Sequence, residues 1–104
     1  MVKIELLSIK PSSRKNKRLV ARFKFTAPGY DPHYRNVHFG QKHGRTYTDH
    51  LNEKKKENWL KRHRYSIERA GYIPWSPAVL SKMILWNKPT IRESIDDYRK
   101  EYGF

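Results

Sequence analysis

A length of 104 residues is that of a single domain with a modest core. The 23 Lys and Arg residues outnumber the 10 Asp and Glu residues, which gives a formal net charge of +13 and a pI near 10.2. A charge of this size predicts a polyanionic partner: nucleic acid first, then an anionic membrane or an acidic protein surface. Aromatic residues make up 13% of the chain, which argues against a disordered basic tail. Without cysteine, neither a disulfide nor a thiolate zinc site can form.

The apolar runs of the chain are short. The longest, such as "MILW", cannot span a bilayer, so we expect no transmembrane segment. The N-terminal stretch "MVKIELLSIK" alternates charged and apolar residues and lacks the apolar segment of a signal peptide. We therefore expect no secretion signal, and a location inside a cell or in a particle assembled there.

Residues 1–47 predict mainly β structure. Apolar and polar residues alternate in "VKIELLSI" (residues 2–9) and in "RLVARFKF" (residues 18–25), as in strands with one face on a core. The turn formers and bases between them predict a hairpin with a basic loop. "RNVHF" (residues 35–39) is a third strand, followed by the polar turn "GQKHGR".

Residues 48–104 predict mainly helices. Thr48 or Asp49 can cap a first long helix. Four side chains of this helix share one stripe that can dock on the core, namely Trp59, Leu60, His63 and Ile67. Ser76 with Pro77 opens a second helix that ends at "NKP". Thr90 with Glu93 opens a third, which runs to about Tyr102. The expected fold is α+β: one domain, residues 1–104, with about three antiparallel strands and about three helices packed on one face of the sheet.

The basic residues concentrate in the first hairpin and the first long helix. Two basic elements and a net charge of +13 favour contact with nucleic-acid phosphates, which requires no defined spacing of the cations. A solvated basic face remains the alternative for either element alone. The predicted nucleic-acid contacts are Arg14, Lys15, Lys17, Arg18, Arg22, Lys24, Lys54, Lys55, Lys61, Arg62 and Arg64.

Other chemistry has weaker support in the sequence. Phe23, Phe25 and Trp59 lie on apolar faces, so a core role is favoured over base stacking. His50 with Asn58 and His63 supplies the residue types of a His-Asn-His nuclease, but on one helix and too closely spaced. No pair has zinc-binding spacing among the five histidines, which are His33, His38, His43, His50 and His63. We therefore expect no catalytic residues, no metal site and no cofactor.

Several short motifs, most of them in the second half of the chain, resemble those of a known protein family. Residues 37–98 resemble a family of small, basic, functionally unassigned proteins of nucleocytoplasmic large DNA viruses. The matching positions are Phe39–Gly40, Tyr47–Thr48–Asp49–His50, Arg62–His63, Leu85–Trp86–Asn87–Lys88 and Ser94–Ile95. The resemblance implies a virion protein made in the interior of an infected host cell.

The function we expect is therefore that of a non-enzymatic virion protein. It would bind duplex DNA through phosphates, without sequence preference, and compact or anchor the viral genome. The first alternative is a minor capsid or scaffold protein whose basic surface contacts capsid proteins or the inner membrane. The second alternative is a metal-dependent nuclease-like enzyme.

Overall fold

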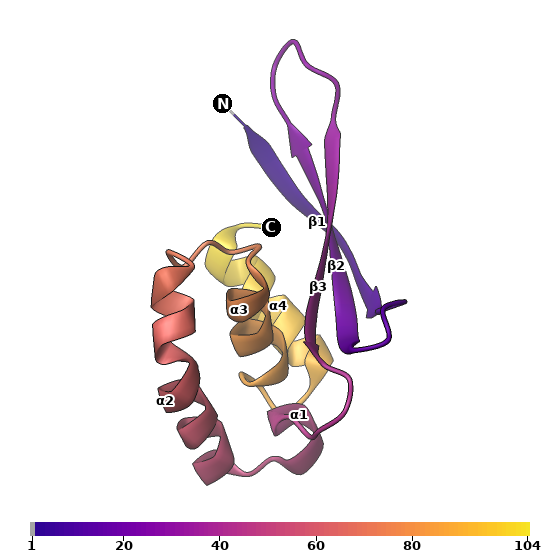
Figure 1. Ribbon diagram of the computed structural model, residues 1–104. Helices are drawn as coiled ribbons and strands as arrows, with labels where there is room; N and C mark the ends of the chain where they lie inside the picture. Colours follow the sequence, from indigo (N-terminus) through magenta and orange to yellow (C-terminus); the bar gives the residue numbers. More distant parts are fainter. Residues whose placement is uncertain (1) are drawn as a thin grey trace.

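The computed structural model describes residues 2–104 and has the predicted α+β fold (Figure 1). Three antiparallel strands in the order β1-β2-β3 precede the helices. No helix in this part of the chain is both long and apolar enough to cross a membrane. The elements are β1 (Lys3–Pro11), β2 (Lys17–Thr26), β3 (His33–Gln41), α1 (Tyr47–His50), α2 (Glu53–Arg69), α3 (Pro77–Leu80), the π-helical turn η1 (Ser81–Leu85) and α4 (Ile91–Tyr102).

The sheet buries the face that the alternating pattern predicts. Leu19, Ala21 and Phe23 of the central strand β2 are buried. Leu19 and Ala21 lie opposite the buried residues Phe39 and Val37 of β3. In β1 the pairing shifts between Leu6 and Ser8, so Leu7 is an extra, exposed residue. This bulge places Ile9 opposite Ala21 on the core side, whereas an unbroken alternation would have turned Ile9 to solvent.

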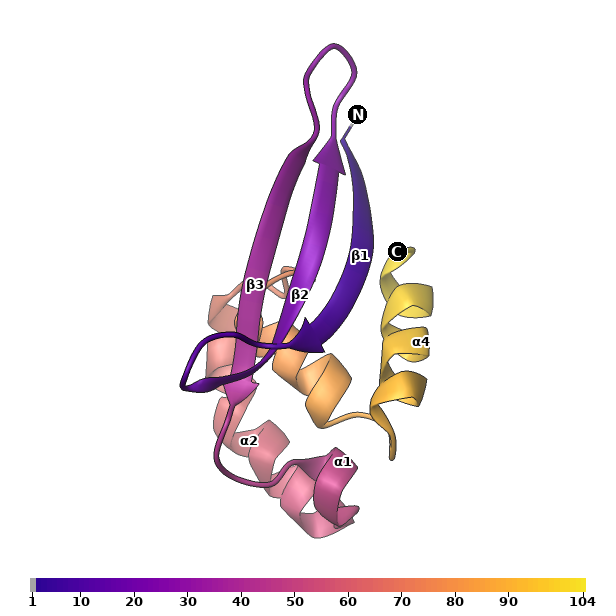
Figure 2. The same cartoon turned by 90° about the vertical axis from the view of Figure 1, so that its right-hand side faces the viewer.

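All the helices lie on one side of the sheet. The segment α3–η1 packs against β3, and α4 packs against η1. Arg99 of α4 donates a hydrogen bond from Nη1 to the carbonyl oxygen of Leu6 in β1, 3.1 Å away. No helix covers the other face of the sheet in the described chain, residues 2–104, and Figure 2 views the molecule from that open side.

The first long helix begins later than its predicted cap. Thr46 caps the short helix α1, and Asp49 accepts a hydrogen bond from the backbone N–H of Thr46 at 2.8 Å. Leu51 then adopts a left-handed conformation with φ of 53°, which ends α1. Asn52 starts α2 by accepting from the backbone N–H of Lys55. Thr48 and Asp49 therefore lie inside α1 and do not cap α2.

Helix α2 reaches the core through other helices. Among the other elements it packs mainly on α1 and α3, and in Figure 1 it lies on the far side of α3 and α4 from the sheet. Trp59 is 9% exposed and stacks on Trp86, which follows η1, with ring centroids 5.0 Å apart and planes at 11°. Of the predicted stripe, Trp59 and Ile67 are buried and Leu60 and His63 are half-buried. Trp59 packs on Trp86 rather than on the sheet.

The later helices agree with their predicted signals. The side chain of Ser76 accepts from the backbone N–H of Val79, with Pro77 in the first turn of α3. Thr90 caps α4 by accepting from the backbone N–H of Glu93, and Gly103 ends the helix in a left-handed conformation. Both helices therefore begin at the residues predicted to cap them.

Candidate nucleic-acid interface

The predicted basic residues lie in three places. One set is on the β1–β2 loop and the start of β2, a second is on the open face of the sheet, and a third is on α2. Arg18 stands apart from all three. In this order the sets are Arg14, Lys15 and Lys17; Arg22 and Lys24; and Lys54, Lys55, Lys61, Arg62 and Arg64.

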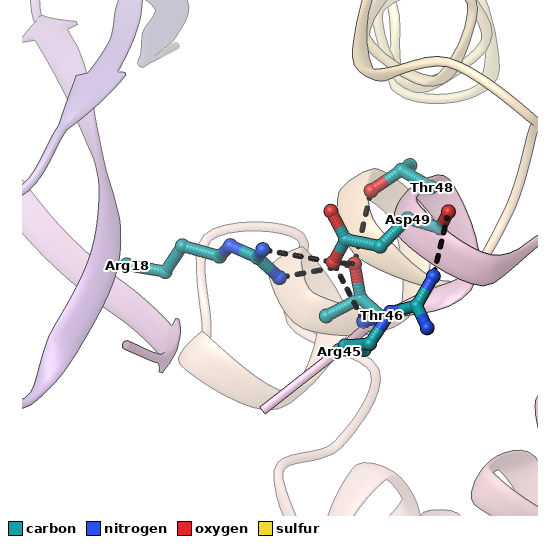
Figure 3. Close-up of polar contacts among 5 residues, drawn as sticks. All are labelled: Arg18, Arg45, Thr46, Thr48 and Asp49. Carbon is teal, nitrogen blue, oxygen red and sulfur yellow. Dashed lines mark hydrogen bonds and ion pairs between the residues drawn. The ribbon is translucent and has the colours of Figure 1, made fainter. Parts of the chain in front are cut away.

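Arg18 joins β2 to α1 (Figure 3). Its Nη2 lies 2.8 Å from Oδ2 of Asp49, and its Nη1 donates to Oγ1 of Thr46 at 3.1 Å. Burial alone would raise the pKa of Asp49, but hydrogen bonds from the Thr46 N–H and the Arg18 guanidinium outweigh it and lower that pKa. Of the eleven predicted contacts, Arg18 is the one whose charge is held most firmly by the fold.

The β1–β2 loop crosses the open face of the sheet. Figure 2 shows it passing in front of β2 and β3 to the outer edge of β3. Ser12 Oγ lies 2.7 Å from Nδ1 of His38 on β3, and the backbone N–H of Lys42 donates to the carbonyl of Asn16 at 3.4 Å. The loop therefore brings its basic residues beside the segment 42–46, which leads from β3 to α1.

A basic groove lies between this segment, α2 and the α3–η1 segment. It consists of two adjoining cavities of about 470 Å³ and about 810 Å³, which share Arg45, Arg62 and Trp86. No Asp or Glu is among the lining residues in the described chain. The cations that line this basic groove are Lys17, Arg45, Lys55, Lys61 and Arg62.

Some of the α2 cations form ion pairs with acidic residues of the same helix, and others do not. Glu57 lies 3.2 Å from Lys61 and 3.9 Å from Lys54, and its pKa is lowered by the hydrogen bond from Lys61 and by both positive charges. Arg64 pairs with Glu68 at 3.0 Å. These exposed pairs are weak and rearrange at little cost. Among residues 2–104, Lys55 and Arg62 form no ion pair, and both line the basic groove.

Aromatic rings form the floor of the basic groove. His63 stacks on Trp59 with centroids 4.1 Å apart, Trp59 stacks on Trp86, and His50 packs against Trp86 at 5.4 Å. Both tryptophans are less than a tenth exposed. They therefore offer little surface on which a base could stack, and the predicted core role of Trp59 is confirmed.

His50 lines the basic groove, and the positive charges there affect its pKa. Its Nδ1 accepts from the backbone N–H of Asn52 at 2.9 Å, while its buried Nε2 has no partner in the described chain. Burial lowers the pKa of His50, and the charges of Lys55 and Arg45 lower it further. Within residues 2–104, no three His, Cys, Asp or Glu side chains gather as the ligands of a metal ion would.

Arg45 is not among the contacts predicted from the sequence. It lies in the stretch "GQKHGR", which is typical of a polar turn, yet it lines both cavities of the basic groove. The signal that could have found it is local: this turn carries two cations and a histidine without an acidic residue. What the turn faces depends on a long-range contact that no local pattern shows.

Comparison with known proteins identifies the family and little else. No curated protein matches the chain, and no solved structure matches it. A family described as "Family of unknown function (DUF5754)" matches residues 7–63, more than half of the chain. The match includes the basic loop, Arg45 and Arg62, and it ends before the Leu85–Lys88 segment on which the viral resemblance partly rests. The chain belongs to the DUF5754 family.

Proposed function

We propose that this protein is a non-enzymatic nucleic-acid-binding protein that holds duplex DNA by its phosphates. The observation that carries the proposal is the basic groove, where five cations from β2, the β3–α1 segment and α2 converge without an acidic residue in the described lining. Binding of DNA phosphates there would release condensed counterions, which is the main source of affinity in sequence-independent binding.

The composition of the basic groove favours backbone contact over recognition of bases. Its four exposed cations, Lys55, Lys61, Arg45 and Arg62, sit at the rim on flexible side chains. The large aromatic rings that could stack on bases are buried in the floor and packed on one another. Long cationic side chains above a closed aromatic floor suit phosphates, which position a protein on DNA but carry no sequence information.

The viral resemblance extends this proposal to a biological setting. We infer a virion protein of a large DNA virus, made inside the infected cell, that compacts or anchors the genome. The net charge of +13 on 104 residues supports a role in neutralising a polyanion.

Fluorescence anisotropy with a labelled duplex of arbitrary sequence tests the proposal. Five phosphate contacts predict that log K falls with log salt with a slope of about −4.5. Scrambled competitor DNA should displace the label as well as the original sequence does. A slope shallower than about −2, equivalent to one or two phosphates, would overturn the proposal, as would strong preference for one sequence. Cleavage of the duplex on addition of Mg²⁺ would replace it with the nuclease alternative.

A further inference from the structure

The open face of the sheet is a second cationic surface. Strand alternation and pairing place on it the side chains that point away from the core. Four of them are cations and one is an acid, Glu5, which pairs with Lys3 at 3.2 Å. We call this surface the sheet face, and its charged and polar members are Lys3, Glu5, Ser8, Lys10, Arg22, Lys24, Tyr34, Asn36 and His38.

Arg22 lies on the central strand of the sheet face, where two side chains of β3 hold its guanidinium. Its Nη1 donates to Oδ1 of Asn36 on β3 at 3.2 Å, and its guanidinium lies 4.8 Å from the ring centroid of Tyr34. Both partners are uncharged, so they orient the guanidinium without neutralising it. Lys24, two residues further along β2, lies opposite Tyr34 on the neighbouring strand. An arginine and a lysine are thus presented together on the central strand.

The sheet face and the basic groove lie on different sides of the molecule. The groove is lined by Trp59 of α2, Ser81 of η1 and Trp86, which follows η1, on the side of the sheet that the helices cover. The sheet face looks away from the helices (Figure 2). Because Arg22 and Lys24 are on the central strand, β3 and its flanking loop stand between them and the groove.

One stretch of DNA is too stiff to serve both surfaces. The longest extent of the molecule is 48 Å. The persistence length of duplex DNA is about 500 Å, roughly ten times as long. A duplex in the basic groove would have to bend sharply around β3 to reach Arg22, and such bending is costly.

We propose that the sheet face binds a second segment of duplex DNA, so that one molecule bridges two segments. The partner follows from charge complementarity, because four cations against one acid suit a continuous polyanion. The proposal rests on the proposed function, which assigns the first segment to the basic groove. It supplies a physical route to compaction, since a bridge draws distant segments together.

A bridging assay tests this proposal. A biotinylated duplex is fixed to streptavidin beads, protein is added, and retention of a second, fluorescent duplex without biotin is measured. The sheet variant is Arg22→Glu with Lys24→Glu. Its matched control is Arg92→Glu with Lys100→Glu, which makes the same charge change at exposed positions of α4. If the sheet variant is poorly folded by circular dichroism, Arg22→Gln with Lys24→Gln replaces it.

The expected result separates bridging from binding. The wild type and the control retain the fluorescent duplex on the beads, whereas the sheet variant retains at least about tenfold less of it. In anisotropy with a single duplex, the sheet variant keeps an affinity within about threefold of the control. A wild type that binds one duplex but retains no second one overturns the bridge and leaves the proposed function standing. Full retention by the sheet variant assigns the second segment to another copy of the chain and also overturns the proposal. Failure of the wild type to bind a single duplex refutes the proposed function itself.

Discussion

The basic groove makes a quantitative prediction for its two shared arginines. Arg45 and Arg62 each line both cavities, so Arg45→Gln with Arg62→Gln removes two of the five groove cations. The slope of log K against log salt should change from about −4.5 to about −2.7, at about 0.9 per phosphate. Between 50 and 200 mM salt, the wild type should then lose about 500-fold in affinity and the variant about 40-fold. Anisotropy titrations at four salt concentrations measure both slopes.

The same substitutions should leave the fold intact. Arg62 is exposed and forms no ion pair among residues 2–104, and the hydrogen bond from Arg45 to the Asp49 carbonyl is long, at 3.4 Å. The control, Arg92→Gln with Lys100→Gln on α4, makes an equal change in net charge and should keep the wild-type slope. If the groove variant keeps the wild-type slope, or if both variants lower it equally, DNA responds to overall charge and the basic groove is not the site.

Three further predictions concern the fold around the groove. Trp59→Ala should lower the free energy of unfolding by about 3–5 kcal/mol, because it empties a buried aromatic stack; an unchanged melting temperature with lost DNA binding would make Trp59 a ligand contact instead. Gly40→Ala should cost about 1–2 kcal/mol for its φ of 79° alone, and more because the added Cβ would lie 2.6 Å from Cδ1 of Leu85; thermal melting checks this, and an unaltered curve would count against the backbone geometry. The lowered pKa of His50 means that its neutral form contributes stability above pH 6.5, which is lost as the pH falls through the lowered value. His50→Asn keeps an acceptor for the Asn52 N–H but cannot titrate, so the acid-induced fall in melting temperature should be smaller; identical pH profiles for both proteins would exclude this role.

The strands could be predicted because one face of the sheet is buried. Along β2, Leu19, Ala21 and Phe23 alternate with mainly polar residues because every second side chain points into the core. The bulge at Leu7 could not be predicted, because "ELLSI" reads equally well with either leucine on the core side. Only pairing with β2 decides which of the two is the extra residue.

The helices were predicted where caps and apolar positions agree. Ser76 with Pro77 and Thr90 with Glu93 are local signals, and both open helices in the structure. The break at Leu51 was missed because a leucine in a left-handed conformation has no local signature. The short helix before this break is held by a long-range contact, since Asp49 accepts a hydrogen bond from Arg18, 31 residues earlier in the chain.

The candidate site could be predicted only in part. The basic residues can be read directly from the sequence, but the groove forms from segments that are far apart in it. The sequence placed cations on two elements, and the structure uses three, with the β3–α1 segment and its Arg45 between them. That junction depends on the backbone hydrogen bond from Lys42 to Asn16, which ties two loops far apart in the sequence. Strand alternation separates Lys17, on the side of buried Leu19, from Arg18 and Arg22, and the contact of Arg18 with α1 then separates these two. Lys17 lines the groove and Arg18 holds α1, while Arg22 faces the open side of the sheet. A single run of basic residues thus supplies a lining residue of the groove, a structural ion pair and part of the sheet face, and the proposed bridge rests on this division.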